Sequence, residues 1–331
     1  MTHVLAVRLD NDGDVLLAGP AIRALAAGAD RVTLLCGPRG RQAGRLLPGV
    51  DEIVCWRSPW IDPEPDPVSP ADLLAAAAQI SRLAINRAVI FGSFHQSPLP
   101  TAMLLRLAGI PWIGATSVDY PGSLLDLRHQ ISDDVHEVER SLDLVRAAGF
   151  DLPPGDDDRL QVKGPDPLGF GERYVVVHPG ASVPARAWAP ERNAELVEAL
   201  PGRVVVTGSP TERSLTAFVA GDRGIDLGGR TSFAELAGVI AGADAIVVGN
   251  TGPAHMAAAV GTPVVSLFAP TVPAVRWRPW RVPHELLYVD VPCAGCRARV
   301  CPVAGHPCLG GVTVDEVVAA VGRLTREAVA A

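Results

Sequence analysis

Residues 245–260, AIVVGNTGPAHMAAAV, place an apolar run, a polar turn with glycine and a helix-forming segment in direct succession. The run AIVV predicts a buried strand. Pro253 fits the first turn of the following helix, where its missing N–H would have no partner in any case. A strand that enters a helix through a short glycine turn is typical of parallel βαβ units. This stretch therefore predicts an α/β fold.

The same alternation extends outward in both directions and forms two blocks. Strands are predicted at 3–8, 32–36, 50–55 and 88–91, and then at 174–178, 203–207, 245–248 and 263–267. Helices are predicted at 15–29, 41–47, 71–83, 99–108 and 134–148, and then at 190–200, 211–220, 233–241, 253–260 and 313–329. Residues 149–170 are rich in Pro, Gly and Asp and predict a linker. We expect two Rossmann-like domains, 1–155 and 156–331, facing each other across a central cleft, with the final helix able to pack back toward the first domain.

The composition suits a globular protein of this size. The 331 residues are 48% hydrophobic and 20% charged, and the formal net charge is −7. An acidic chain lacks the basic surface that a general nucleic-acid binder needs, so we expect no nucleic-acid partner. No signal peptide and no apolar stretch of membrane-spanning length is visible in the sequence. We therefore expect a cytoplasmic protein, with at most peripheral association with the inner face of the cytoplasmic membrane.

The turn after residues 245–248 offers a site for an anion. Backbone N–H groups of Thr251 and Gly252 would point out of the helix end, where the helix dipole also favours negative charge. His255 lies one turn further and could donate to a phosphate. A simply capped helix with a satisfied core histidine explains the same residues equally well from this fragment alone.

A second strand ends in a similar turn. His178-Pro-Gly-Ala-Ser182 is followed by Arg186 and by Pro190 at the start of a helix. Ser182 offers a hydroxyl, and Arg186 offers a planar fork suited to phosphate. A solvated loop with an exposed arginine is the alternative.

The first strand leads into Leu9-Asp-Asn-Asp-Gly-Asp14. Gly13 allows a tight turn from strand to helix, and Asp14 would stand at the helix N-terminus. A carboxylate there is an ordinary N-cap, and that role is favoured for an isolated Gly-Asp pair. The functional alternative is a general base that takes a proton from an acceptor hydroxyl.

Four cysteines lie within a short segment near the C-terminus: Cys293, Cys296, Cys301 and Cys308. Four thiolates could close a tetrahedral zinc or iron site. Such a site would be structural, because it leaves no open coordination position for chemistry. Free buried cysteines or an opportunistic disulfide are the alternatives.

Together these pieces resemble glycosyltransferase family 9, the ADP-heptose:lipopolysaccharide heptosyltransferases. The resemblance covers nearly the whole chain and depends on the order and spacing of its blocks rather than on any one motif. The blocks are VLAVRLDNDGDVLLAGPAIRAL (4–25), LLPGVDEIV (46–54), HEVERSLDLVRAAG (136–149), VVVHPGAS (175–182), RAWAP (186–190), residues 226–271 and the four-cysteine segment.

The resemblance implies a GT-B fold, an inverting mechanism and no metal or other cofactor in catalysis. Its site residues carry over position by position. Asp14 matches the catalytic base after the loop glycine; Ser182, Arg186, Thr251, Gly252 and His255 match the donor diphosphate site; Glu212 and Thr231 match the nucleoside site; and Asn250 matches a sugar contact. Two of these differ from the usual family residue. Arg186 stands where heptosyltransferases usually have Lys, and Asn250 where the best-known members have Asp.

The resulting hypothesis is an inverting transfer of a sugar, heptose above all, from a nucleotide diphosphate sugar such as ADP-heptose. The acceptor would be a hydroxyl of a glycan, a lipid-linked molecule or a small molecule. Two alternatives stay open: a GT-B-fold nucleotide-sugar epimerase, and a catalytically impaired sugar-nucleotide-binding protein.

Overall fold

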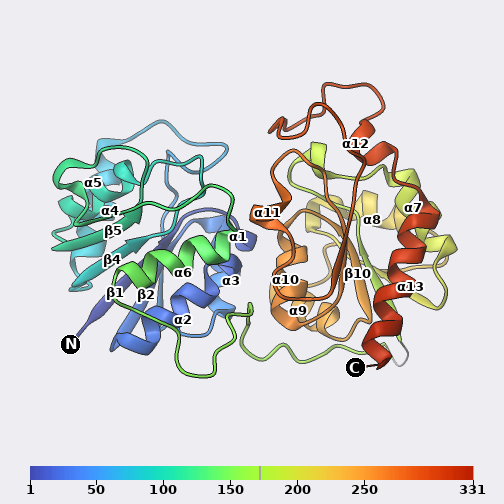
Figure 1. The fold of residues 1–331 in the computed structure, drawn as a ribbon, viewed down its shortest axis with the longest axis horizontal. Helices are drawn as coiled ribbons and strands as arrows, with labels where there is room; N and C mark the ends of the chain where they lie inside the picture. Colours follow the sequence, from blue (N-terminus) through green and yellow to red (C-terminus); the bar gives the residue numbers. More distant parts are fainter. Residues whose placement is uncertain (171–172, 331) are drawn as a thin grey trace. The chain divides into compact units, whose positions relative to one another are not determined.

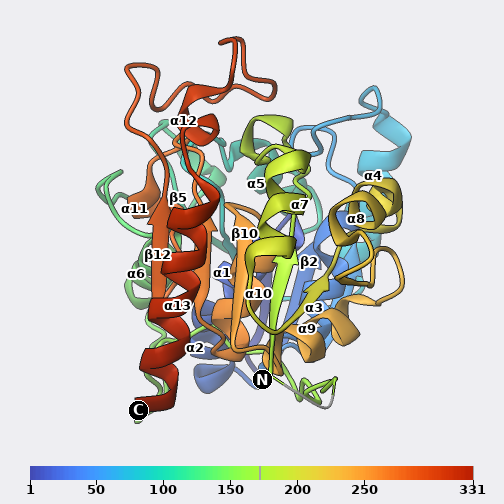
Figure 2. The ribbon, with the colours of Figure 1, turned by 90° about the vertical axis from the view of Figure 1, so that its right-hand side faces the viewer.

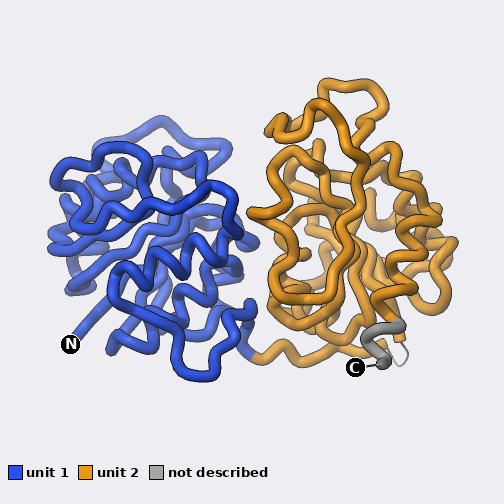
Figure 3. The backbone as a smooth tube through the Cα atoms, viewed as in Figure 1, with its two compact units in different colours: residues 1–163 blue, residues 164–331 orange. Residues whose placement is uncertain are grey.

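The computed structural model describes residues 1–170 and 173–330, with 326–330 described by their backbone alone. The chain forms two compact units, residues 1–163 and 164–331 (Figure 3). Each unit contains a six-stranded sheet in which all neighbouring strands run parallel. The α/β fold with two Rossmann-like units is therefore confirmed.

Unit 1 is built around the sheet β3-β2-β1-β4-β5-β6 (Figure 1). Its strands are β1 His3–Arg8, β2 Arg31–Cys36, β3 Glu52–Cys55, β4 Arg87–Ile90, β5 Trp112–Thr116 and β6 Leu127–His129. Its helices are α1 Asp12–Leu17, α2 Gly19–Gly28, α3 Arg41–Leu46, α4 Pro70–Ser81, α5 Leu99–Leu107 and α6 Glu137–Ala147, with short 3-10 turns at Pro38–Gly40 (η1) and Gly122–Leu124 (η2). Helices α4 and α5 pack on the sheet face that carries Leu5 and Val7. Helices α2 and α6 pack against each other elsewhere in the unit.

Unit 2 is built around the sheet β12-β11-β10-β7-β8-β9. Its strands are β7 Tyr174–His178, β8 Arg203–Val206, β9 Ile225–Asp226, β10 Ala245–Gly249, β11 Val264–Leu267 and β12 His284–Leu287. Its helices are α7 Pro190–Ala199, α8 Arg213–Ala220, α9 Phe233–Ala241, α10 Gly252–Val260, α11 Ala274–Trp277, α12 Pro307–Gly310 and α13 Val314–Ala330, with 3-10 turns at Pro184–Arg186 (η3) and Pro210–Glu212 (η4). Helices α7 and α13 lie side by side on one face of the sheet (Figure 2).

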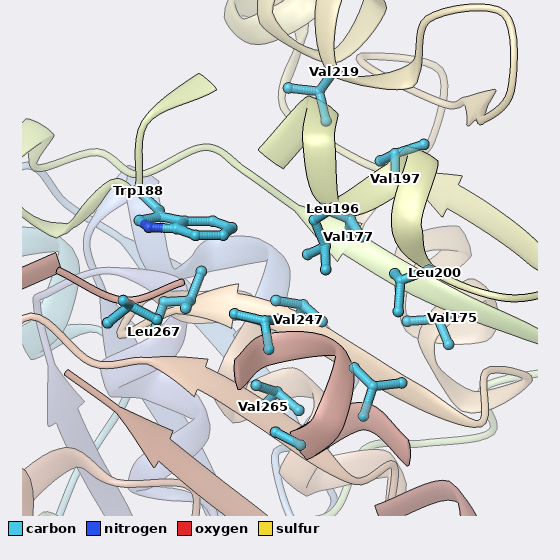
Figure 4. Close-up of a cluster of buried hydrophobic side chains, with 14 of the residues drawn as sticks. Val175, Val177, Trp188, Leu196, Val197, Leu200, Val219, Val247, Val265 and Leu267 are labelled. Carbon is cyan, nitrogen blue, oxygen red and sulfur yellow. The ribbon is translucent and has the colours of Figure 1, made fainter. Parts of the chain in front are cut away.

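Short aliphatic side chains form the core of unit 2. Val175, Val177, Val247 and Val265 project from neighbouring strands toward α7 and α13, and Trp188 closes one end of the cluster (Figure 4). Strands of this kind are buried on both faces, which is why they appear as continuous apolar runs in the sequence rather than as alternating ones.

Both sheets reverse their direction of growth at the centre. In unit 1 the chain adds β2 and β3 on one side of β1 and then places β4 on the other side. In unit 2 it adds β8 and β9 beside β7 and then places β10 on the opposite side. Ligands of open α/β sheets bind at the carboxyl ends of strands at such a switch point. The loops after β1 and β4, and after β7 and β10, are therefore the places to look for a site.

The division between the units falls after Lys163, later than the predicted boundary at 155/156. Residues beyond 155 are fastened to unit 1. The buried Arg23 guanidinium contacts both carboxylate oxygens of Asp156 at 2.7 Å and the carbonyl of Arg159 at 2.9 Å. The N–H of Lys163 bonds the Leu46 carbonyl at 2.7 Å. The polar composition of this segment thus reflects specific pairing rather than a free linker.

Several elements differ from the sequence-based prediction, and the short helices α11 and α12 were not predicted. The single helix expected at 15–29 divides at Ala18 into α1 and α2, with Pro20 in the first turn of α2. Four strands were not predicted: β5, β6, β9 and β12.

Helix α13 packs within unit 2, where Val317, Val321 and Leu324 join the core. Among the described residues, no helix combines the length and the apolar character that crossing a membrane requires.

Candidate active site

Asp14 lies in the first turn of α1, directly after the carboxyl end of β1. Asn11, not Asp14, is the N-cap residue of this helix, and it makes no side-chain capping bond. The Asp14 carboxylate instead accepts a hydrogen bond from Arg8 Nη2 through Oδ1, at 3.0 Å. The ordinary N-cap role that the sequence favoured for Asp14 is therefore wrong. Gly13 is buried in the same turn.

Arg8 is the last residue of β1 and is only 1% exposed. Its guanidinium contacts three carboxylates: Asp10 from Nε at 2.9 Å, Asp14 from Nη2 at 3.0 Å and Glu137 from Nη1 at 3.6 Å. Nη2 also donates to the Ser93 hydroxyl at 2.9 Å. We call Arg8, Asp10, Asp14 and Glu137 the Arg8 cluster.

The loop after β4 contributes two further polar side chains next to the Arg8 cluster. Gln96 donates from Nε2 to Asp10 Oδ1 at 2.5 Å, and its own Oε1 accepts from the N–H of Ser93 at 3.0 Å. Asp10 and Asp14 come from the loop after β1, and Ser93 and Gln96 from the loop after β4. The four side chains therefore meet at the switch point of the sheet in unit 1.

Burial dominates the electrostatics of the cluster. It raises the pKa of Asp10 to about 6, although Arg8 opposes the shift. Burial also raises the pKa of Glu137, and the charge of Asp14 adds to that effect. Burial lowers the pKa of Arg8, but the three carboxylates outweigh it and leave the pKa above its ordinary value, so the guanidinium stays charged.

Five members of this site were not predicted from the sequence: Arg8, Asp10, Ser93, Gln96 and Glu137. Arg8 and Asp10 carried a signal, because an arginine ends an otherwise apolar strand and an aspartate follows it two residues later. Ser93, Gln96 and Glu137 had none, since only the fold brings β4 and α6 to the end of β1.

The other predicted residues gather in unit 2, around the start of α10. Strand β10 ends at Gly249, and a Cβ atom added there would lie 2.6 Å from the carbonyl oxygen of Arg186. The loop after β7 thus packs directly on the turn between β10 and α10, and only glycine permits this approach. The prediction that Arg186 and residues 250–252 belong to one site fits this packing.

The turn itself is only partly open. The N–H of Thr251, expected to be available, bonds the carbonyl of Gly249 at 2.8 Å. Thr251 is the N-cap of α10 but makes no side-chain capping bond, and Gly252 opens the helix, where an N–H has no acceptor within the helix. Asn250 is 6% exposed and donates to the Ala269 carbonyl at 3.3 Å. Its Oδ1 has no hydrogen-bond partner in the described part of the chain.

His255 and Ser182 differ in their exposure to solvent. His255 lies in the first turns of α10 and is 6% exposed. Ser182 is exposed in the loop after β7. His178, at the end of β7, is held by Thr207 Oγ1 at 2.9 Å, and burial lowers its pKa. Arg186 supplies a positive charge to the same loop.

Glu212 and Thr231 occupy adjoining loops near the outer strands β8 and β9. Glu212 Oε2 accepts from the N–H of Ser209 at 2.7 Å, while Oε1 lies over Gly180 so closely that a Cβ atom would collide with it. The loop before Thr231 is tied to this one by the N–H of Gly229, which bonds the Gly208 carbonyl at 2.8 Å. Glu212 thus adjoins the turn after β7.

The four cysteines of the C-terminal segment are free thiols, and no group of three or more His, Cys, Asp or Glu in the described ranges is arranged to hold a metal ion. Cys308 is buried, which raises its pKa, and the nearby thiols of Cys301, Cys293 and Cys296 add to the effect. The segment is attached to the Arg186 loop. The N–H of Ala185 bonds the Arg299 carbonyl at 2.9 Å, and His306 Nε2 lies 3.1 Å from the Ala185 carbonyl oxygen.

Solved structures with the same fold support this architecture. The structure of the Escherichia coli ADP-heptose lipopolysaccharide heptosyltransferase II superposes with a TM-score of 0.76 over 99% of both chains, at 20% identity. A family 9 glycosyltransferase from Veillonella parvula gives a TM-score of 0.77 over 98% of this chain and 97% of that one, at 15% identity. The chain thus has the GT-B fold of these proteins.

Sequence comparisons point to the same group. Lipopolysaccharide heptosyltransferase 3 of Escherichia coli is 32% identical over 41% of this chain and 42% of its own length. Lipopolysaccharide heptosyltransferase 1 of Pseudomonas aeruginosa is 35% identical over 50% of this chain and 48% of its own length. Both alignments span less than half of the relative. The family model of glycosyltransferase family 9 (heptosyltransferase) matches residues 95–306, which include every predicted site residue except Gly13, Asp14 and Cys308. This match covers more than half of the chain, which therefore belongs to glycosyltransferase family 9.

Proposed function

We propose that this protein is an inverting heptosyltransferase that uses ADP-heptose and needs no metal for catalysis. The observation that carries the proposal is the packing of the Arg186 backbone on Gly249. It joins the loop after β7 to the N-terminus of α10, next to the buried Asn250 Oδ1. A cation, a helix N-terminus and a buried acceptor suit a diphosphate joined to a polyhydroxylated sugar.

In the proposed reaction, Asp14 takes the proton from the acceptor hydroxyl as its oxygen attacks the anomeric carbon. The bond between that carbon and the β-phosphate oxygen breaks, and ADP leaves with the electron pair. Negative charge grows on the β-phosphate, where Arg186, His255, Ser182 and the N–H of Gly252 would stabilise it. Attack from the face opposite the leaving group inverts the anomeric configuration.

The remaining residues would recognise the donor. Glu212 Oε1 and Thr231 would bind the nucleoside, and Asn250 Oδ1 would accept from a sugar hydroxyl. The acceptor would be a hydroxyl of a glycan, a lipid-linked molecule or a small molecule. The names of the relatives make lipopolysaccharide the first acceptor to test.

A panel of ADP-, UDP-, GDP- and dTDP-sugars in a thermal unfolding assay tests the donor. A ligand that binds only the native state raises the melting temperature by mass action. ADP-heptose should give the largest rise, and a larger rise with another nucleotide sugar would refute the donor assignment. Consumption of the donor without any acceptor would instead favour an epimerase.

We also propose that Cys293, Cys296, Cys301 and Cys308 bind one structural zinc or iron ion. Their donor set suits a tetrahedral site, although the described side chains are not arranged around one. Metal analysis of the purified protein should find about one equivalent. Cys308→Ser should lose it, whereas Cys36→Ser, at a buried thiol of unit 1, should keep it.

A further inference from the structure

The Arg8 cluster holds more negative than positive charge around the proposed base. One guanidinium contacts three carboxylates, each through a different nitrogen atom. Arg8 comes from a strand in the centre of the sheet, and its side chain is 2% exposed. The position of the guanidinium is therefore fixed by the core of unit 1 and not by a mobile loop.

Asp14 is the member of the cluster that reaches solvent. Its side chain is 22% exposed, compared with 10% for Asp10 and 2% for Glu137. Oδ1 is held by Arg8 Nη2, and no other hydrogen bond or ion pair to this carboxylate occurs in the described ranges. Oδ2 is thus the oxygen that can accept a proton, and Arg8 determines its direction.

A single arginine beside a carboxylate makes that carboxylate a weaker base, because the positive charge stabilises the ionised form. Asp10 and Glu137 counteract this effect, since they draw on the same guanidinium in a buried setting. Arg140 also faces Glu137 from α6 and offsets part of its charge. Asp12 faces elsewhere, because its Oδ1 accepts from the N–H of Ala43 at 2.8 Å.

We infer that Arg8 is a positioning residue that orients the Asp14 carboxylate, and that Asp10 and Glu137 share its charge so that Asp14 stays basic enough to deprotonate the acceptor. This inference rests on the proposed function, in which Asp14 is the base. It assigns a role to three residues that contact neither donor nor acceptor in the proposed reaction. The geometry separates orientation, supplied by Arg8, from basicity, maintained by Asp10 and Glu137.

The pH dependence of kcat/KM for heptosyl transfer tests the inference. Asp10 is ionised above pH 6, so in Asp10→Asn the Arg8 charge acts more fully on Asp14 there, and kcat should fall several-fold because the base is weaker. The difference from wild type should shrink below pH 6. Glu137→Gln should lower kcat above pH 6 by less, since its contact is longer. KM for ADP-heptose should not change in either variant.

Asp12→Asn is the matched control, because it removes a carboxylate from the same turn without touching Arg8. Its pH profile should overlay that of the wild-type enzyme. Arg8→Lys keeps the charge but cannot contact three carboxylates at once, so it should retain more kcat than Arg8→Met yet less than wild type. A wild-type kcat above pH 6 in Asp10→Asn, or an equal loss in Asp12→Asn, would overturn the inference.

A double-mutant cycle separates this inference from the proposed function. Asp10→Asn and Asp14→Asn should affect the free energy of unfolding non-additively, because both carboxylates contact Arg8. Asp12→Asn and Asp14→Asn should be additive. If the wild-type protein transferred no sugar to any acceptor but the first pair were coupled, the proposed function would fail and the charge sharing would stand. Additivity in the first pair would refute the charge sharing itself.

Discussion

The loop after β1 in unit 1 and the turn after β10 in unit 2 both lie at the switch points of two similar parallel sheets. The first is filled by its own charges, because Arg8 contacts three carboxylates. The second leaves a buried acceptor, Asn250 Oδ1, without a hydrogen-bond partner in the described structure. The same topology therefore surrounds two different settings, a charged cluster in one unit and an unpaired buried acceptor in the other, to which we assign the proposed base and the proposed donor site.

The largest expected effect is that of Asp14→Asn, which tests whether unit 1 supplies the base. If unit 1 supplies the base, kcat should fall by about 10²–10⁴-fold, while the affinity for ADP should stay the same because its proposed site lies in unit 2. Steady-state kinetics and calorimetric titration with ADP measure the two effects separately. Turnover close to that of the wild-type enzyme would remove Asp14 from the mechanism.

Gly249→Ala tests whether the receptor in unit 2 depends on close backbone packing. The new methyl group would lie 2.6 Å from the Arg186 carbonyl oxygen, so the loop must move. A displaced Arg186 should lower kcat/KM by about 10- to 100-fold, because positioning errors near 1 Å have effects of this size. Gly169→Ala, where a methyl group meets nothing within 4 Å, is the control and should leave kcat/KM unchanged.

Arg186→Ala tests whether a positive charge in the loop after β7 contributes to ADP binding. Loss of a charged hydrogen bond to the diphosphate should weaken ADP binding by about tenfold or more. Arg186→Lys should restore part of that affinity, since it keeps the charge and loses the planar fork. Equal affinity of Arg186→Ala and the wild-type protein for ADP would show that this loop does not bind the diphosphate.

The stability of the protein should respond to the crowded charges of unit 1. The folded state raises the pKa of Asp10 from 3.8 to about 6, so the stability that Asp10 contributes is present below pH 4 and is lost as the pH rises through 6. Asp10→Asn removes this loss. Its free energy of unfolding relative to wild type should therefore increase between pH 4 and 7, by up to about 3 kcal/mol. Ser93→Ala, which removes a neutral partner of Arg8, should show a difference that does not vary with pH.

The sequence predicted the parts of this molecule that local patterns determine. The run before Asn250 and the proline after Gly252 placed β10 and α10 to within one residue of their observed bounds. Strands β6 and β9 escaped prediction because they have three and two residues, too few for any periodicity to be visible. The split at Ala18 was missed because α1 and α2 follow each other without a loop between them.

The candidate site shows the same division between local and long-range information. The family resemblance pointed to Asp14, Arg186, Asn250 and His255, which lie in the loops or first helical turns that follow β1, β7 and β10. The partners of Asp14 depend on contacts between β1, β4 and α6, which are far apart along the chain. Nothing near Glu137 in the sequence indicates that its carboxylate faces Arg8. Charge sharing of this kind becomes visible only when the sheet has brought the strands together.

Residues 156–163 are bonded to unit 1, and this affects where the chain can be divided into fragments or recombined with a relative. A cut at 155 would remove Asp156 from Arg23, which is 7% exposed and would keep a buried charge without its carboxylate. It would also separate residues 156–163 from unit 1, to which the N–H of Lys163 is bonded through the Leu46 carbonyl. A crossover placed after Lys163 keeps these bonds within one parent, so chimeras joined there should express as folded protein where those joined at 155 do not.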